Sequence, residues 1–219
     1  MACSDSAVRM RLSWISFIWP LLLLAACSQE DTTQVTDPSA DAMSQDLGPF
    51  FQSEAAMFDN MRNAVGTSSN DNWVKMMIAH HEGGAAISRD VLAEAPPARI
   101  AELANRVIVS QNQAVRELEA LVRPGPPNLE IAHIISPSLE AMYNATMAVQ
   151  GPDASEVWLR KIIEHHCGAI AMSDALMARG AIPQDIVGTV LKLRQAKRRE
   201  LAKLEQALAE IENQRDLQK

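Results

Sequence analysis

The chain has 219 residues, of which 47% are hydrophobic, and its formal net charge at pH 7 is −7. A chain of this length and composition can bury the core of one ordinary domain. Its acidic balance provides no electrostatic footprint for nucleic acid, so we expect no nucleic-acid partner.

The amino terminus predicts a lipoprotein leader. Arg9 and Arg11 precede an apolar stretch, residues 12–24, that is too short for a confident membrane span. The stretch leads through two alanines to Cys27, which resembles the lipobox of bacterial lipoproteins. Residues 1–26 would then be a signal peptide, and Cys27 would become the lipid-modified first residue of the mature chain. An ordinary secretory signal or an uncleaved anchor helix is the alternative.

This processing implies that the protein is located in the cell envelope. The protein would face the periplasm, anchored by the lipid on Cys27. Ser28 follows the cysteine, which by resemblance to enterobacterial lipoproteins favours the outer membrane. Cys3 would be lost with the leader, so Cys167 would be the remaining cysteine and no intrachain disulfide is expected.

Two segments follow the leader. Residues 27–47 are rich in Ser, Thr, Asp and Gln and lack apolar periodicity, which predicts a flexible tether. Residues 48–219 predict one helical domain, because no stretch alternates in the manner of a strand. A proline-rich connection separates two halves, about 48–123 and 136–217.

The first half predicts three helices. The first runs from about residue 49 to residue 65, and the second carries residues 73–92, with Asn70 or Asp71 as its N-cap. The third spans about residues 98–122. Its apolar positions form one face: Ile100, Leu103, Val107, Ala114, Leu118 and Leu121.

The second half repeats this plan. Ser136 is expected to open its first helix and Asp153 to start the next, which carries residues 158–177. The last and longest helix spans about residues 184–214. We interpret its basic cluster as a solvated face. A contact with lipid, a protein partner or a second copy of the chain is the alternative. The cluster consists of Lys192, Arg194, Lys197, Arg198 and Arg199.

The feature that organises the chain is an internal duplication. Residues 73–88 read WVKMMIAHHEGGAAIS, and residues 158–173 read WLRKIIEHHCGAIAMS. The offset between the copies, 165 − 80 = 85 residues, is ungapped. A chain that repeats itself is best interpreted as two copies of one supersecondary unit packed together. With two helices from each half closing a four-helix core, the predicted fold is an all-α bundle.

The repeat places two pairs of histidines at matched positions, and these predict a metal site. By helical periodicity, His80 and His165 lie on the apolar stripe of their helices. His81 and His166 lie about 100° further round, on a second apolar row. Adjacent histidines on one helix diverge, so a shared site has to be assembled from both copies. A single buried pair is more often a hydrogen-bonded core feature, whereas the matched second pair favours a metal.

Thioether sulfurs are the expected companions of these imidazoles. Met77 and Met172 lie on the histidine helices, and Met57 and Met142 occupy matched positions on the preceding helices. Sulfur suits Cu(I), and imidazole suits copper and zinc alike, so a shell of His and Met in an envelope protein favours copper. Cys167 is either a further soft ligand or a small buried hydrophobe.

These strings resemble the domain of unknown function 305 family. The resemblance covers about residues 49–208 and implies a ferritin-like helical fold in a bacterial envelope protein. Some members bind copper and contribute to copper tolerance, so it also implies a copper site at the matching residues. It rests on Met57-x3-Met61, Asp71 two residues before Trp73, Met77-Ile-x-His80-His81-x-Gly and His165-His166-x-Gly-Ala-Ile-x-Met172.

The chain also departs from the family pattern. Three positions where the family has methionine are Ile87, Thr146 and Ile162 here. Each half therefore retains a different part of the thioether set. Either one composite site is shared between the halves, or the copper role has weakened in this chain.

Three functions compete at this point. The first is a copper-binding lipoprotein for sequestration or tolerance, which is not an enzyme. The second is a metal-free envelope scaffold that binds a protein partner. The third is a di-metal redox enzyme, which usually needs Glu-x-x-His pairs on two bundle helices. The only such string, Glu130-Ile-Ala-His133, lies in the connection between the halves.

Overall fold

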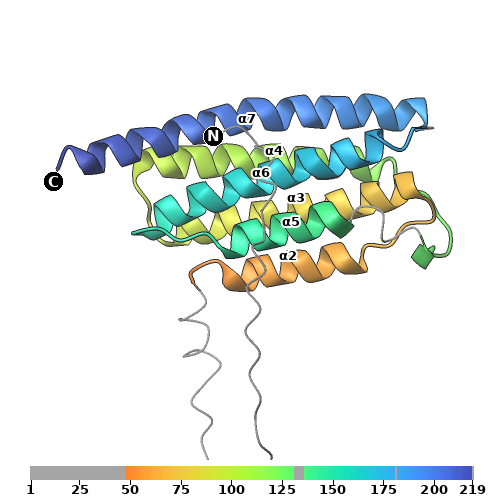
Figure 1. The fold of residues 1–219 in the computed structure, drawn as a ribbon, viewed down its shortest axis with the longest axis horizontal. Helices are drawn as coiled ribbons and strands as arrows, with labels where there is room; N and C mark the ends of the chain where they lie inside the picture. Colours follow the sequence, from red (N-terminus) through yellow and green to blue (C-terminus); the bar gives the residue numbers. More distant parts are fainter. Residues whose placement is uncertain (1–47, 131–135, 181, 219) are drawn as a thin grey trace, which may run out of the picture.

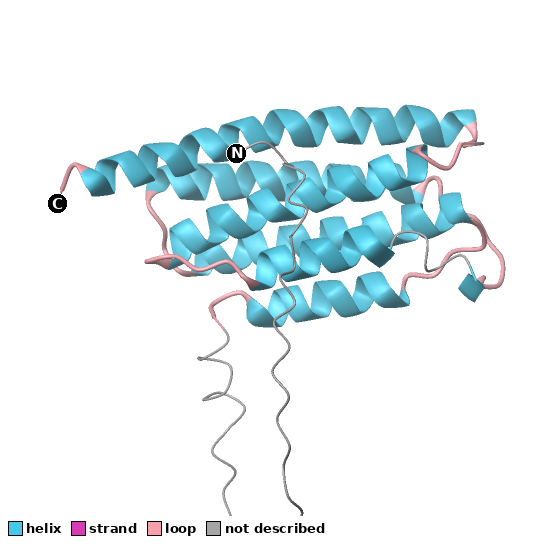
Figure 2. Cartoon of the chain, in the orientation of Figure 1, coloured by secondary structure: helices cyan, strands magenta, loops and turns pink. Residues whose placement is uncertain are grey.

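The structure is a computed structural model that describes residues 48–130, 136–180 and 182–218. These residues form six helices and no strand, so the predicted all-α bundle is confirmed (Figure 2). The predicted signal peptide, Cys27 and the predicted tether lie outside the described residues. The helices are α2 (Phe51–Asn63), α3 (Ser69–Ala93), α4 (Ala98–Glu119), α5 (Ser136–Met147), α6 (Ala154–Met177) and α7 (Gln184–Asp216).

The helices lie roughly side by side along the long direction of the molecule (Figure 1). Helices α3, α4, α6 and α7 form the central bundle, while α2 packs on α3 and α5 packs on α6, and both of these helices add side chains to the hydrophobic core. The two halves therefore follow the same plan, and α3 and α6 are in contact between them. Within the described part of the chain, no helix is long and apolar enough to cross a membrane.

The two matched helices α3 and α6 run antiparallel where they cross. The indole Nε1 of Trp158, near the start of α6, donates a 3.3 Å hydrogen bond to Oγ of Ser88, near the end of α3. Midway along both helices, the rings of His80 and His165 stack. The pseudo-two-fold axis that relates the halves therefore passes close to the histidines.

The predicted N-cap is confirmed for one of the two histidine helices and is wrong for the other. Asp153 caps α6 as predicted, because its carboxylate accepts the N–H of Glu156 at 2.9 Å. In α3 the cap is Ser68, whose Oγ accepts the N–H of Asp71 at 3.2 Å. The prediction of Asn70 or Asp71 as this cap is wrong, since the carboxylate of Asp71 is engaged with other backbone groups.

Asp71 and Glu156 occupy matched positions in the first turns of α3 and α6, and both are 1% exposed. Asp71 accepts the N–H of Arg123, just beyond α4, at 2.9 Å. Glu156 accepts from Arg160 on its own helix at 2.7 Å and from Arg215 near the end of α7. Each carboxylate thus ties the start of a histidine helix to the end of the helix that follows it, which fixes how the histidines sit in the bundle.

Candidate metal centre

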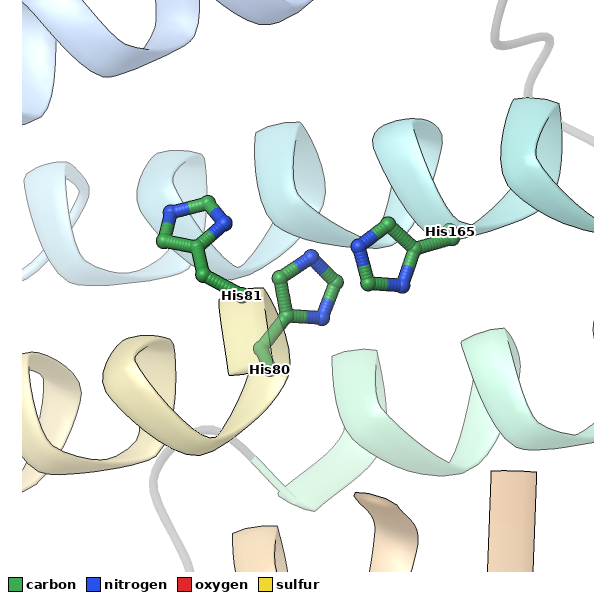
Figure 3. Close-up of side chains that lie close together, drawn as sticks. All are labelled: His80, His81 and His165. Atoms are coloured by element: carbon green, nitrogen blue, oxygen red, sulfur yellow. The ribbon is translucent and has the colours of Figure 1, made fainter. Parts of the chain in front are cut away.

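Three imidazoles meet in the interior where α3 crosses α6 (Figure 3). His80 and His81 come from α3 and His165 from α6, and one ring nitrogen of each lies within 4.8 Å of the others. All three are at most 1% exposed. The rings of His80 and His165 are stacked, with centroids 3.7 Å apart and planes 6° from parallel. We call these three residues the histidine cluster.

Most ring nitrogens around this point have no hydrogen-bond partner among the described residues. Both nitrogens of His80 and of His81 are buried and unpartnered, as is Nδ1 of His165 and of His166. A buried polar group left without a partner costs about 1–3 kcal/mol. So many unpartnered ring nitrogens in one place indicate that they bind a ligand or have another function. A metal ion accepting the nitrogen lone pairs fits this donor set.

The distances also suit a metal ion. Two imidazole nitrogens that bind one ion at about 2.0–2.1 Å lie no more than about 4.2 Å apart. Nitrogens already within 4.8 Å need only a sub-ångström approach to reach this separation. The parallel planes of His80 and His165 have to tilt as well, because the in-plane lone pairs of parallel rings do not converge.

The imidazoles are held in their neutral form. Burial lowers the pKa of each residue of the histidine cluster well below the ordinary value, and the charge of Lys197 lowers it further. Burial also lowers the pKa of His166, although its hydrogen bond to Glu200 works in the opposite direction. Neutral imidazole is the protonation state that binds metals.

Lys197 sets the tautomer of His165 through an intervening amide. The ammonium of Lys197 only donates and lies 3.2 Å from Oε1 of Gln111. The amide nitrogen of Gln111 therefore faces Nε2 of His165, 3.1 Å away, and donates to it. Neutral His165 then carries its proton on Nδ1. To offer Nε2 to an ion, His165 has to give up the hydrogen bond from Gln111.

Glu200 of α7 holds His166 in the opposite tautomer. Its Oε2 lies 2.8 Å from Nε2 of His166 and 2.9 Å from Nζ of Lys197. Burial raises the pKa of Glu200, but the hydrogen bond from His166 and the charge of Lys197 outweigh it, and the net pKa is well below its usual range. The ionised carboxylate accepts the Nε2 proton, which leaves the lone pair of His166 on Nδ1. Carboxylates often orient metal-binding histidines in this way.

Comparison with known proteins places the chain in a family. The model of the family described as "Domain of unknown function (DUF305)" matches residues 22–122 and 136–208. The chain belongs to the DUF305 family. It is also similar to the crystal structure of a DUF305 fragment from Deinococcus radiodurans, with 22% identity and a TM-score of 0.50. That match covers 67% of this chain and 99% of the fragment, and at this identity it supports the fold alone. A search of curated proteins found no match.

The four methionines predicted as companions of the histidines are all in the core. Met77 and Met172 are 0% exposed. Met57 and Met142 seat against glycines of the histidine helices. A Cβ added to Gly83 would lie 2.6 Å from Sδ of Met57, and a Cβ added to Gly168 would lie 2.2 Å from Sδ of Met142. This packing accounts for the two methionines structurally, and ligation by any of the four sulfurs stays a prediction.

Cys167 lies next to His166 on α6 and is partly buried, but it does not belong to the histidine cluster. It is disulfide-bonded, so the expectation of no intrachain disulfide is wrong for this structure, and its sulfur is not a free thiolate ligand. The other cysteines, Cys3 and Cys27, lie outside the described residues, as does His133. A leader cleaved before a lipid-modified Cys27 would leave neither of these cysteines able to form a disulfide.

Three polar residues around the histidines were not predicted as part of the site: Gln111, Lys197 and Glu200. The interpretation of Lys197 as part of a solvated face is wrong, because this residue is 1% exposed. A signal was present in the spacing. Gln111 and Lys197 each interrupt an apolar helical stripe, where a polar side chain faces the interior and needs a partner there.

Gly84 makes room for the ring of His165. A Cβ at Gly84 would lie 2.4 Å from Nε2 of His165 and 2.7 Å from Nε2 of Gln111. We expect Gly84→Ala to displace the imidazole and to lower the free energy of unfolding by about 1–3 kcal/mol, as overpacking does.

Gly188→Ala in α7 is the matched control for this substitution, because no atom other than those of its chain neighbours and of the α7 backbone lies within 4 Å of its added Cβ. It should stabilise the protein by about 0.5–1 kcal/mol, the usual gain of alanine over glycine inside a helix. Urea unfolding of the metal-free variants measures both effects. A Gly84→Ala variant as stable as the Gly188→Ala variant would contradict the close packing.

Proposed function

We propose that this DUF305 protein binds copper through its two histidine pairs and sequesters the metal in the bacterial envelope or confers tolerance to it. The observation that carries the proposal is the histidine cluster. It consists of three fully buried imidazoles with ring nitrogens within 4.8 Å of one another, contributed by both copies of the repeat. A metal-free scaffold would leave the cost of these unpartnered nitrogens unexplained.

Ligand chemistry supports copper over harder cations. Calcium and magnesium prefer oxygen ligands, whereas imidazole serves copper and zinc, and thioether sulfur serves Cu(I). The buried methionines on and beside the histidine helices supply that sulfur. The ammonium of Lys197, which contacts Gln111 behind His165, adds a positive charge that penalises a divalent ion more than a monovalent one. Cu(I) is therefore the proposed form.

A titration of the metal-free protein with Cu(I), in oxygen-free buffer, tests this proposal, and a parallel titration with Cu(II) tests the oxidation state. We expect the wild type to bind Cu(I) and a variant with all four paired histidines changed to Ala to bind none. His133→Ala is the matched control, because His133 belongs to neither pair. Retained copper stoichiometry in the four-histidine variant would remove the histidines from the site. A wild type that binds no copper would leave the metal-free scaffold.

We propose binding rather than catalysis. A ferritin-like di-metal oxidoreductase needs several inward carboxylates and paired Glu-x-x-His strings. The chain has one such string, which ends at His133 in the connection between the halves. The carboxylate that does reach a paired histidine, Glu200, is already engaged with Lys197 and His166.

We also propose that the protein is anchored at the periplasmic side of the outer membrane by a lipid on Cys27. Cys27→Ser should move the protein from the membrane fraction to the soluble fraction, because the mutation removes the lipid attachment site. Fractionation with immunodetection measures the shift, and mass spectrometry of the wild type identifies the mature amino terminus. A mature chain that retains residues before Cys27 would contradict the lipoprotein proposal.

A further inference from the structure

A groove between α4 and α7 opens on the surface and reaches toward the buried histidines. Its volume is about 700 Å³. Ser110 and Ala114 line it from α4, and Ala196, Lys197 and Glu200 line it from α7. The histidine cluster itself is at most 1% exposed, so an ion has to pass between side chains to reach it.

Two chains of polar contacts connect this groove to the histidines. The side chain of Glu200 is 24% exposed, yet it contacts Nε2 of the fully buried His166 at 2.8 Å. Lys197 contacts Glu200 at 2.9 Å and Gln111 at 3.2 Å, and Gln111 contacts His165 at 3.1 Å. The groove therefore meets both the carboxylate and the ammonium that border the histidines.

The faces of the histidine helices toward α2 and α5 are closed by methionines beside the histidines, and the ion pair of Glu54 and Lys161 on these faces is at most 9% exposed. Met57 and Met142 fill the notches above Gly83 and Gly168 and are at most 3% exposed. Passage of a cation through such packing carries a high desolvation cost. The polar chains from the groove offer an ion partners along the way.

We propose that the α4–α7 groove is the route by which the ion enters and leaves the histidine cluster, with Glu200 as its first ligand. This inference rests on the proposed function. The ionised carboxylate exchanges its ammonium partner, Lys197, for the incoming cation. Lys197 keeps its contact with Oε1 of Gln111, so the ammonium is not left without a partner. Separation of Gln111 from His165 then frees Nε2 of that histidine for the ion.

The first test fills the groove without touching the histidines. Ala196→Phe places a ring in the groove, and Ala209→Phe places the same ring at an exposed position of the same helix, outside the groove lining. Cu(I) supplied from its bicinchoninate complex measures uptake by stopped flow, and excess chelator measures release. We expect Ala196→Phe to slow uptake and release alike by about tenfold, about 1.4 kcal/mol in the barrier. The Kd should stay unchanged, and Ala209→Phe should leave both rates unchanged.

The second test removes the proposed first ligand. Glu200→Gln should slow Cu(I) uptake severalfold, because the amide attracts a cation less than the carboxylate does. Glu210→Gln is the control, since Glu210 lies on α7 and pairs with Arg99 on the surface. This pair of variants also decides the matter if Ala196→Phe does not fold.

The outcomes separate the route from the site. Unchanged uptake and release in Ala196→Phe and Glu200→Gln, with Cu(I) still bound, would overturn the route and leave the proposed function standing. Faster release in Ala196→Phe with unchanged uptake would overturn it too, since the groove would then only support the packing of the site. Absence of Cu(I) binding by the wild type would overturn both proposals.

Discussion

Lys161→Met should lower the free energy of unfolding by about 3–5 kcal/mol, the cost of breaking a buried ion pair from one side. Nζ of Lys161 donates to Oε2 of Glu54 at 2.7 Å and to the carbonyl of Thr146 at 2.9 Å. The side chains of Glu54 and Lys161 are 2% and 9% exposed. Burial already raises the pKa of Glu54 against the lowering effect of Lys161. Without the ammonium, the carboxyl group is either charged and unpaired or has to take up a proton.

The matched pair of positions in the duplication supplies the control for this prediction. At the offset of 85 residues, Lys161 corresponds to Met76 and Glu54 to Leu139, and both counterparts are buried. The double variant Glu54→Leu, Lys161→Met reproduces that apolar pair and should recover most of the lost stability, since apolar replacement of a buried ion pair is often neutral or stabilising. Urea unfolding of the wild type, the two single variants Glu54→Leu and Lys161→Met, and the double variant forms a double-mutant cycle. A double variant as unstable as Lys161→Met would contradict the prediction.

The fold and the meeting of the histidines were predictable because both follow from the duplication. A pattern repeated without a gap has to fold into the same unit twice, and the apolar stripes of such units pack on each other. That argument placed α3 and α6 within a few residues of their observed bounds. It also anticipated that imidazoles of the two copies come together, as His80 and His165 do.

The partners of the histidines were not predictable in this way, because the copies diverge where those partners lie. Pro97 and Pro183 are the N-caps of α4 and α7, and their offset, 183 − 97 = 86, differs by one residue from that of the histidine helices. At this offset Gln111 corresponds to Lys197, and these side chains contact each other.

The same offset pairs Ala114 with Glu200, so the second copy has a carboxylate where the first has a methyl group. His166 consequently has an anionic partner, whereas both ring nitrogens of its counterpart His81 are unpartnered.

The asymmetry extends to the backbone next to the rings. Gly84 lets the ring of His165 approach α3, whereas the matched position on α6 is Ala169. The histidines of the site are therefore repeated in both copies, whereas the residues that surround them differ between the copies. Helical periodicity places a side chain on a face, but it does not say which of several facing groups that side chain meets. The tautomers of His165 and His166 depend on which group each ring meets, so periodicity alone does not predict them.

The metal-free protein should lose stability as the pH falls below about 6.5, the ordinary pKa of histidine in an unfolded chain. Burial lowers the folded-state pKa of all four paired histidines. Above pH 6.5 the four histidines are neutral in both the folded and the unfolded protein, so their contribution to the free energy of unfolding does not change with pH. Below it the unfolded state binds protons that the folded state does not, so stability falls with pH, by up to about 1.4 kcal/mol per pH unit for each histidine.

Other groups act in different windows or with the opposite sign, so the control has to isolate the histidines. The lowered pKa values of Asp71, Glu117 and Glu200 remove stability only below about pH 4.3. The raised pKa values of Glu54 and Glu164 add stability as the pH falls toward the ordinary value. Urea unfolding from pH 8 to pH 5 should therefore be compared with a variant that carries Gln at the four paired positions. Equal slopes in the two proteins below pH 6.5 would show that the imidazoles take up protons as readily in the folded as in the unfolded state, which would contradict the lowered pKa values that their burial implies.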